Sequence, residues 1–473
     1  MALFPILVLA GLGLGIGLVP SARWRRSFLL LVSLAAAYAL QPATPLRSAS
    51  FWFPTLSLVL VVLVWLAVKP AAAPWREALA TGATLAVIVL ALGATRYLPL
   101  GAWFAGLRPP SWTVILAVVG IVAVAAALAA FQPVSARWLA AGTALGILVV
   151  FVVLKSPDLA TGASAWLRRM SGQSPELAAP IDLTWLGFSY LAFRLLHVLL
   201  DWRAGRLPTV GLSEFVTYAL FFPALVAGPI DRVERFLGDL RRAPALTAEA
   251  AREGGRRILL GLVKKFVLAD SLAMIALQPL SAERVTSGGW LWVLLYAFSF
   301  QLYFDFSGYT DIALGTACLV GVRLPENFRR PYLQSSLTAF WSSWHITLAD
   351  WFRAYVFNPL TRALRSMSKP WPAAAVILVA QLATMILIGL WHGIGWGFVI
   401  WGAWHGLGLF LQNRWSAWTR TTGSRLSAQP WTRRLLAVGG TLLTFHYVTL
   451  GWVWFTLPDT PLAGRVLMRL FGG

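Results

Sequence analysis

Long apolar runs follow one another along almost the whole chain, separated by short polar stretches. An α-helix needs about 20 apolar residues to cross a bilayer. Runs that approach this length lie near residues 3–20, 27–40, 51–68, 76–94, 112–131, 137–154, 183–200, 212–228, 256–278, 289–304, 306–321, 372–390, 394–412 and 435–456. Some are too short to cross, so we expect about eleven to thirteen spans plus re-entrant segments. The pattern predicts an all-α, polytopic transmembrane protein.

Three stretches interrupt this pattern. Residues 155–182 form a polar link rich in Pro, Gly and Ser, and residues 229–257 contain "AEAAREGGRR", which is typical of a helix on a membrane surface. Residues 322–370 combine arginine, tryptophan and polar groups. The link predicts two parts, with residues 1–155 as N-terminal transmembrane helices that serve as a scaffold or partner surface. Residues 180–473 are the predicted catalytic core, because polar and aromatic residues enter the apolar segments there.

Composition and charge support a multi-pass membrane protein, which we expect to lie in the cell (inner) membrane. Of the 473 residues, 58% are hydrophobic and 12% are charged, whereas soluble domains carry roughly 25% charged residues. The formal net charge is +21, but the arginines are scattered through short loops, as in cytoplasmic loops of membrane proteins. This distribution argues against nucleic-acid binding and suits an anionic donor. The single cysteine, Cys318, excludes an internal disulfide and a cysteine-cluster metal site.

Ionisable residues inside apolar segments are costly, so they are candidate functional groups. The run "FQLYFDFSGYTDIALG", residues 300–315, contains Asp305, Tyr309 and Asp311. Gly308 and Gly315 allow either a close backbone approach or a broken helix, which is tolerated only where protein or water satisfies the freed groups.

Residues 324–360 contain a second set of candidates. Trp341 and His345 are four residues apart, so a helix would place them on one face, and Asp350 and Arg353 are three apart and can pair. We expect a helix break at Pro359.

Two of the five histidines lie in repeated Trp-His-Gly triplets within "LIGLWHGIGWGFVIWGAWHG", residues 387–406. On one unbroken helix, at about 100° per residue, His392 and His405 would point to nearly opposite sides. We therefore expect that they do not share a site, that the glycines after His392 end its helix, and that His405 serves packing. His197 and His446, each alone on an apolar helix, are expected to be structural.

A neutral imidazole suits general-base chemistry. The histidines lack the spacing of a zinc helix, so no metal site is expected. A serine nucleophile is not favoured, because no Gly-x-Ser-x-Gly occurs.

The two stretches around His345 and His392, together with "LYFDFSGYTDIALG" and "FFPALVAGPIDR", make the region from about residue 185 to 412 resemble the membrane-bound O-acyltransferase (MBOAT) superfamily. The similarity is greatest to the bacterial branch that holds the alginate O-acetyltransferase and the teichoic-acid D-alanyl transfer protein. It implies a ring of helices, including re-entrant segments, around a central tunnel. His392 matches the catalytic histidine and His345 the histidine that assists or lines the tunnel. Residues matched less specifically, as tunnel-lining or structural, are Trp341, Trp344, Trp391, Asp305, Tyr309, Asp311, Asn327 and Arg353.

The resemblance implies transfer of an acyl group, with acetyl favoured, from a cytoplasmic thioester to a hydroxyl of an exported or cell-envelope polysaccharide. The donor would be an acyl-CoA or an acyl-carrier thioester, and no permanently bound cofactor is expected. Expected partners are the lipid bilayer, the polysaccharide or a periplasmic or extracellular acyl-relay protein, and an acidic acyl-carrier protein. Alginate-type members usually carry two arginines where this chain has Ser342 and Ser343, so D-alanyl transfer to a teichoic-acid-like polymer stays open. An exporter without chemistry and a structural scaffold are the alternatives of other classes.

Overall fold

The computed structural model describes residues 3–69, 75–97, 107–131, 135–242, 244–369, 371–422 and 429–473. Among these residues, the regular structure is helical apart from one isolated bridge between Phe328 and Trp344. The predicted all-α class is therefore confirmed. The chain divides into two compact units, residues 1–258 with 312–324 and residues 259–311 with 325–473.

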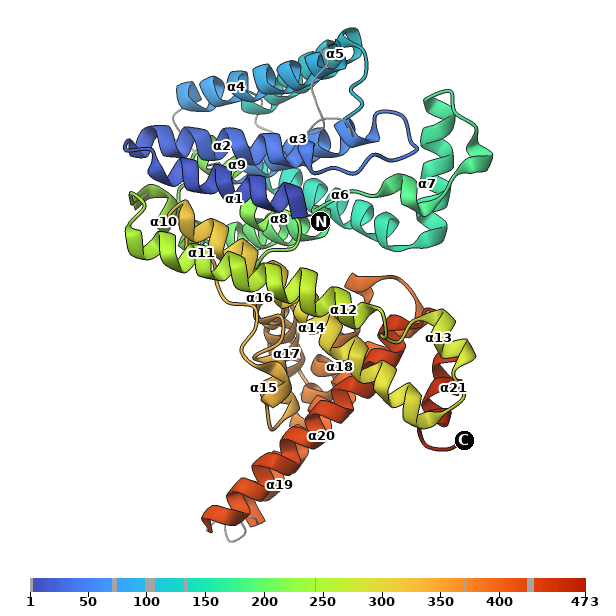
Figure 1. Ribbon diagram of the computed structural model, residues 1–473. Helices are drawn as coiled ribbons and strands as arrows, with labels where there is room; N and C mark the ends of the chain where they lie inside the picture. The colour runs from blue at the N-terminus through green and yellow to red at the C-terminus, as the bar shows by residue number, and fades with distance from the viewer. Residues whose placement is uncertain are drawn as a thin grey trace. The chain divides into compact units, whose positions relative to one another are not determined.

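The first unit contains the N-terminal helices and the helices that precede the aromatic core. Its helices are α1 (Leu3–Leu18), α2 (Ala22–Ala39), α3 (Ala49–Val68), α4 (Trp75–Ala94), α5 (Trp112–Phe131), α6 (Ala136–Lys155), α7 (Pro157–Met170), α8 (Phe188–Arg203), α9 (Leu212–Ala219), α10 (Val233–Arg242) and most of α11 (Ala248–Leu262). Figure 1 shows α1, α2 and α3 side by side, and α4 alongside α5. Buried Leu, Val, Ala and aromatic side chains from these helices form its core.

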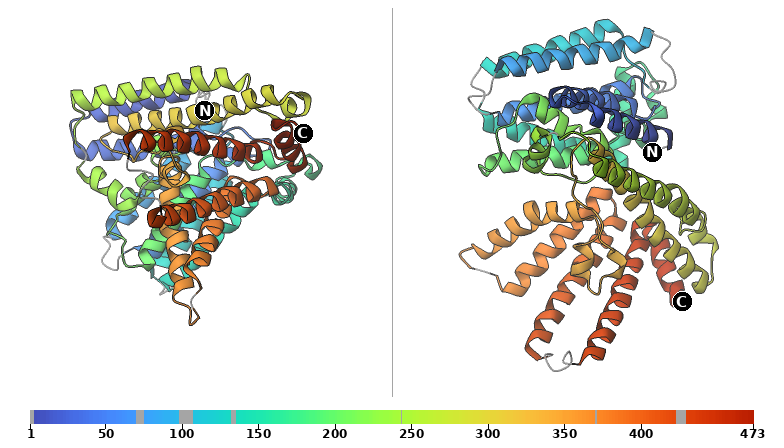
Figure 2. Two further views of the ribbon diagram at one scale, coloured as in Figure 1. Left: turned by 90° about the horizontal axis from the view of Figure 1, so that it is seen from below. Right: turned by 60° about the vertical axis from the view of Figure 1, so that its left-hand side comes forward.

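The second unit contains the remaining helices. These are the π-helical turn η5 (Val263–Ala269), α12 (Asp270–Ala273), α13 (Pro279–Arg284), α14 (Gly288–Leu319, which enters the first unit at Ile312), α15 (Leu337–Trp341), α16 (Ile346–Phe352), the π-helical turn η7 (Arg353–Phe357), α17 (Asn358–Arg365), α18 (Ala373–His392), α19 (Trp396–Thr422), α20 (Pro430–Thr456) and α21 (Thr460–Leu470). In Figure 2 the orange and red helices form two adjacent pairs, α17 with α18 and α19 with α20. Helix α18 also packs along α19.

Five helices in the described ranges are long and apolar enough to cross a membrane. They are Ala49–Val68, Arg76–Tyr97, Ala136–Lys155, Ala373–His392 and Pro430–Thr456. Several other predicted spans are shorter apolar helices, such as Leu3–Leu18 and Leu212–Ala224. The polytopic class is thus confirmed, while the larger number of spans, the ring and the tunnel stay predictions.

Helix α14 is continuous where two separate apolar segments were predicted. Gly308 and Gly315 do not break it; instead each permits a close backbone approach. A Cβ at Gly308 would lie 2.8 Å from the carbonyl oxygen of Gly261, and one at Gly315 would lie 2.6 Å from that of Gly254. The first of the two alternatives, close approach, is therefore the one that the chain adopts, because only glycine leaves room for the facing backbone.

The predicted helix break at Pro359 is wrong. Helices α16 and α17 form one continuous helical segment, joined by the π-helical turn η7. Proline lacks the N–H that bonds to the carbonyl four residues earlier, and its ring collides with that carbonyl in a regular helix. The corresponding residue here is Tyr355, within the wider π turn, so the helix accommodates Pro359 by a local change of pitch.

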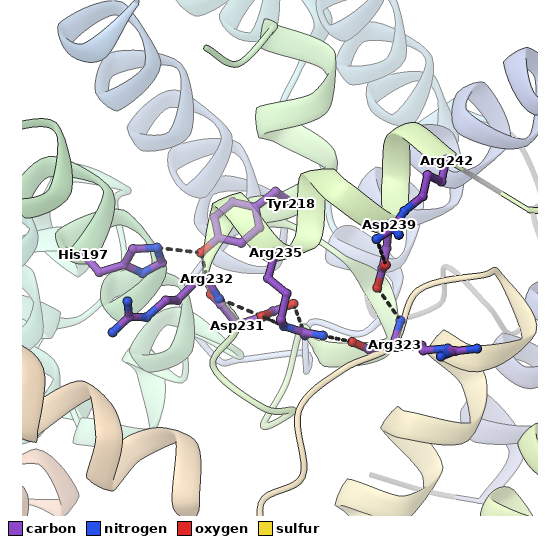
Figure 3. A network of polar contacts seen from close by, with 8 residues as sticks. All are labelled: His197, Tyr218, Asp231, Arg232, Arg235, Asp239, Arg242 and Arg323. Carbon is purple, nitrogen blue, oxygen red and sulfur yellow. Dashed lines mark hydrogen bonds and ion pairs between the residues drawn. The ribbon is translucent and has the colours of Figure 1, made fainter. Parts of the chain in front are cut away.

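A polar network in the first unit fixes the "FFPALVAGPIDR" stretch (Figure 3). Tyr218 Oη donates to the carbonyl oxygen of Asp231 at 2.8 Å and lies 3.2 Å from His197 Nε2. Arg235 Nε donates to the Asp231 carboxylate at 2.7 Å, and another nitrogen of its guanidinium donates to the Arg323 carbonyl. His197 is therefore bonded within the packing of the unit, as expected for a structural histidine.

The predicted polar link contains a helix, α7, held by a buried ion pair. Arg168 Nε on α7 donates to the carboxylate of Asp182 at 2.6 Å, and Ser164 donates to the same oxygen. Burial alone would raise the pKa of Asp182, but the hydrogen bonds from Arg168 and Ser164 outweigh it and hold that pKa below its usual value near 3.8. Residues 155–182 are thus an ordered part of the first unit.

Arg168→Met is expected to weaken the docking of α7, because it leaves the Asp182 carboxylate buried without its cation. Hydrogen–deuterium exchange of α7 should accelerate by about 10²-fold. Arg169→Met, at the exposed neighbouring position, is the matched control and should leave exchange unchanged. In the wild type, the lowered pKa means that the stabilisation is complete at neutral pH and is lost only as the pH falls below about 3.8. Equal exchange in both variants would show that the pair does not hold the helix.

Candidate active site

A small cavity of about 50 Å³ lies within the second unit, and both Trp-His motifs contribute to it. Its walls come from α14, α15, α16, α18, α19, α20 and the turn before α16. The lining residues are Leu302, Phe306, Trp341, Trp344, His345, Leu348, Ile388, His392, Trp401, Trp452 and Phe455. The wall is therefore apolar and aromatic, with two imidazoles and the indole nitrogens as its polar groups.

His392 is the last residue of α18. The chain continues through Gly393, in an extended conformation, and helix α19 begins at Trp396. The predicted helix end after His392 is thus confirmed. The imidazole is partly buried, with ring centroids 4.7 Å from Phe455 and 5.7 Å from Trp401. The end of α18 directs this residue to the cavity while the neighbouring helices cover its sides.

Glycines let α18 and α19 pack closely around this position. A methyl group at Gly389 would overlap the carbonyl oxygen of Phe398, and one at Gly402 would lie 2.6 Å from the carbonyl oxygen of Met385. Small residues at helix contacts allow this approach in membrane proteins. The glycines of the segment therefore determine where the end of α18 lies relative to α19.

His345 does not share a helix with Trp341, so that prediction is wrong. Helix α15 ends at Trp341, and His345 precedes α16 with a left-handed backbone at φ 43°. The chain turns at Ser342–Trp344 and brings Trp341, Trp344 and His345 to the cavity by a loop rather than by helical periodicity. The His345 ring is buried, with its centroid 4.7 Å from that of Phe306.

Trp391 packs between the two imidazoles. Its ring centroid is 4.4 Å from that of His392 and 5.9 Å from that of His345. Trp391 is buried and does not line the cavity itself. The predicted residues His345, His392, Trp341 and Trp344 thus come together at one cavity, with Trp391 packed behind them.

Part of the cavity wall was not predicted from the sequence. Trp401, Trp452 and Phe455 line the cavity, but they lie on apolar helices where tryptophan and phenylalanine are common. The one signal for Trp401 was its position between the two Trp-His-Gly triplets. Their role depends on how α19 and α20 pack, which periodicity alone does not reveal.

Asp305 and Asp311 lie outside the cavity wall and form ion pairs. Lys264 Nζ is 2.6 Å from the Asp311 carboxylate, and Lys265 pairs with Asp305. Both lysines belong to the π-helical turn η5, which packs against α14. Charges in apolar surroundings are tolerated when paired, so these residues hold the two helices together. Tyr309, on the same helix, is buried beside them.

Three further predicted features have structural roles. Arg353 donates to Asp350 at 2.9 Å on an exposed surface, which confirms the predicted pair. His405 is fully buried, its Nδ1–H donates to the Trp401 carbonyl at 2.9 Å, and it does not line the cavity. Asn327 is also fully buried, and its side chain accepts a hydrogen bond from the backbone N–H of Thr347, two residues after His345.

In the part of the chain that the structure describes, no group of three or more His, Cys, Asp or Glu side chains could hold a metal.

Comparison with known proteins shows which family the chain belongs to. The chain is 33% identical to a teichoic acid D-alanyltransferase of Streptococcus thermophilus over 58% of this chain and 68% of that protein. It is 34% identical to a probable alginate O-acetylase of Azotobacter vinelandii, over 71% of this chain and 63% of that protein. A peptidoglycan O-acetyltransferase of Helicobacter pylori is 34% identical over 55% of this chain and 47% of that protein. The chain thus spans about two thirds of the first two relatives and about half of the third.

The model of the membrane-bound O-acyltransferase family matches residues 27–448, which include every residue of the cavity wall except Trp452 and Phe455. The match therefore covers most of the chain, and it agrees with the apolar, helical structure. The chain belongs to the membrane-bound O-acyltransferase family and is a membrane O-acyltransferase.

Proposed function

We propose that this protein moves a short acyl group, with acetyl favoured, from a thioester donor to a hydroxyl of an exported or cell-envelope polysaccharide. The observation that carries the proposal is the cavity that gathers both Trp-His motifs. The acceptor class is supported by the names of the relatives, which act on alginate, teichoic acid or peptidoglycan. The transfer occurs in the inner membrane, directly or through an acyl-relay protein outside the cell membrane.

In the proposed mechanism His392 is the general base. Its neutral nitrogen accepts the proton of the acceptor hydroxyl as the hydroxyl oxygen attacks the thioester carbonyl carbon. The new C–O bond forms, the carbonyl electrons move to oxygen, and the C–S bond then breaks as the carbonyl re-forms. The departing thiolate takes the proton from the imidazolium. A positioned base contributes about 10²–10⁴-fold to such a step.

The remaining polar groups of the cavity position the donor. His345 faces the same space as His392. The indole nitrogens of Trp341 and Trp401 are buried and have no hydrogen-bond partner within the described ranges, so their N–H groups are available to a carbonyl oxygen. Hydrogen bonds to the developing oxyanion stabilise the transition state of acyl transfer. The aromatic wall excludes water, which would otherwise hydrolyse the thioester.

The size of the cavity favours a short acyl group. Its volume is about 50 Å³, about a third of that of a cavity of about 150 Å³ that binds benzene. An acetyl group fits this space, and a long fatty acyl chain does not.

Ile388→Ala is expected to enlarge the acyl pocket, because Ile388 is buried on the cavity wall. The ratio of kcat/KM for butyryl-CoA to that for acetyl-CoA should rise by about 10-fold or more, since each methylene in an apolar pocket is worth roughly 10–200-fold. Leu387→Ala, at the neighbouring residue, which is 44% exposed, is the matched control. An unchanged ratio in Ile388→Ala would place the acyl group elsewhere.

D-alanyl transfer from a carrier protein is the second candidate. The similarity to the teichoic acid D-alanyltransferase and the formal net charge of +21 favour it, because a basic surface attracts an acidic carrier. This version predicts that an acidic, phosphopantetheine-bearing carrier protein is recovered with the purified membrane protein.

Membranes that contain the protein, incubated with [¹⁴C]acetyl-CoA, test the proposal. Label is expected on the glycan fraction, and membranes from cells lacking the protein are the control. Label on glycan only when D-alanyl-carrier replaces acetyl-CoA would select the second candidate. If the protein exports glycan but transfers neither acyl group, it is a transporter, and both proposed acyl-transfer functions are refuted.

A further inference from the structure

The backbone of His345 lies in a conformation that a histidine rarely adopts. Its φ and ψ are 43° and 53°, in the left-handed region where a Cβ is crowded by the following carbonyl. Such a residue stays in place only when its surroundings hold it. The direction of the His345 ring therefore depends on the contacts that fix the chain on either side.

A strap formed by Asn327, Phe328 and Arg329 supplies those contacts. Before His345, the backbone N–H of Arg329 donates to the Ser343 carbonyl at 2.9 Å, and Phe328 forms an antiparallel bridge with Trp344. After His345, the Ile346 N–H donates to the Asn327 carbonyl at 3.0 Å. The strap thus holds the residues on both sides of the left-handed position.

The side chain of Asn327 makes two further hydrogen bonds to the chain after His345. Its Oδ1 accepts from the Thr347 backbone N–H at 3.2 Å and from the Thr347 hydroxyl at 2.7 Å. Asn327 is completely buried, whereas its Nδ2 has no hydrogen-bond partner among the described residues. Asn327 therefore acts here as an acceptor, and it does not line the cavity.

We propose that Asn327 is a positioning residue for acyl transfer: its side-chain oxygen holds Thr347 and thereby keeps His345 in the left-handed turn that aims the imidazole at the cavity. The inference rests on the proposed function, in which His345 contributes to the site of transfer. Of the two roles expected for Asn327, tunnel-lining or structural, it takes up the structural one and gives it a specific function.

The test compares two substitutions of similar size. Asn327→Leu removes the acceptor, so kcat for transfer from acetyl-CoA should fall by about 10²-fold, the effect of a displacement near 1 Å. KM for acetyl-CoA should change little. Asn327→Asp keeps an acceptor oxygen: at this buried position the neutral carboxylic acid is favoured, its carbonyl oxygen accepts from Thr347, and its hydroxyl replaces the unused Nδ2, so its kcat should stay within about fivefold. Thr347→Val and Thr347→Ser make the same comparison at the residue whose hydroxyl donates to Asn327. The larger loss of kcat is expected in Thr347→Val, which lacks the hydroxyl.

A readout independent of activity separates this inference from the proposed function. Hydrogen–deuterium exchange of residues 343–347 should accelerate in Asn327→Leu and not in Asn327→Asp, while the thermal melt of the detergent-solubilised protein reports folding. Equal exchange and equal kcat in the two variants would overturn the positioning role. Absence of acyl transfer by the wild type, with the exchange difference present, would refute the proposed function and leave the role of Asn327 in the turn intact.

Discussion

His392→Ala is expected to lower the rate of acyl transfer by about 10³-fold or more while the protein still folds. The substitution removes the proposed base from the end of α18, and a base of this kind contributes about 10²–10⁴-fold. The lost ring also opens a path for water beside Phe455 and Trp401, which adds competing hydrolysis. The measurement is kcat for labelled acetyl transfer to glycan, with the amount of folded protein determined by size-exclusion chromatography in detergent.

His405→Ala is the matched control, because it removes the same ring from the same tripeptide sequence. His405 is buried, bonds to the Trp401 carbonyl and does not line the cavity. Its loss should lower the melting temperature and cost less than about tenfold in kcat per folded molecule. Near-wild-type turnover in His392→Ala, or an equal loss in both variants, would remove His392 from the proposed role.

Gly389→Ala is expected to lower the rate of transfer by about 10²-fold, although the glycine touches no substrate. The added methyl group would overlap the Phe398 carbonyl oxygen, and a backbone atom in a packed helix pair cannot move away cheaply. Overpacking of this kind costs about 1–3 kcal/mol. The strain is relieved by shifting α18 from α19, and His392 lies less than one turn further along α18. Because a displacement near 1 Å can cost about 10²-fold in rate, activity should fall more than stability does.

Gly395→Ala is the control for this prediction. Gly395 lies in the short connection between α18 and α19, six residues after Gly389, and a methyl group there would meet no atom within 4 Å. This variant should keep its melting temperature, and the comparison of both variants by thermal melt and kcat separates a local loss of geometry from general unfolding. Wild-type activity in Gly389→Ala would mean that the two helices tolerate separation at this point.

Features that depend on local pattern could be predicted from the sequence. Apolar runs located most helices to within a few residues, as in 51–68 against Ala49–Val68 and 137–154 against Ala136–Lys155. The Asp350–Arg353 pair follows from helical spacing, and the end of α18 after His392 follows from the glycines that come next. These outcomes are fixed by interactions between residues close in the sequence.

Features that depend on packing could not be predicted. The left-handed turn at His345 exists because the strap at Asn327 holds it, and that strap lies about 20 residues earlier in the chain. The continuity of α14 past Gly308 depends on the helix that approaches it, and the passage through Pro359 depends on a π turn. Trp452 and Phe455 reach the cavity from α20 without any sequence motif of their own. In each case the deciding partner is distant in sequence, where periodicity carries no information.

The π turn at Arg353–Phe357 has a consequence for comparing and redesigning this protein. A π turn takes up about one more residue than an α-helical turn, so it acts as an inserted residue within a continuous helix. Deleting one residue there would restore regular pitch and leave the downstream positions, including Arg362 and Arg365, on their present face of the helix, whereas a regular α-helix that kept every residue would rotate them by about 100° about the helix axis. His345, which precedes the insertion, would keep its place. A one-residue gap in an alignment of this segment would therefore mark the loss of the π turn, with the basic face and the reaction centre both in their present places.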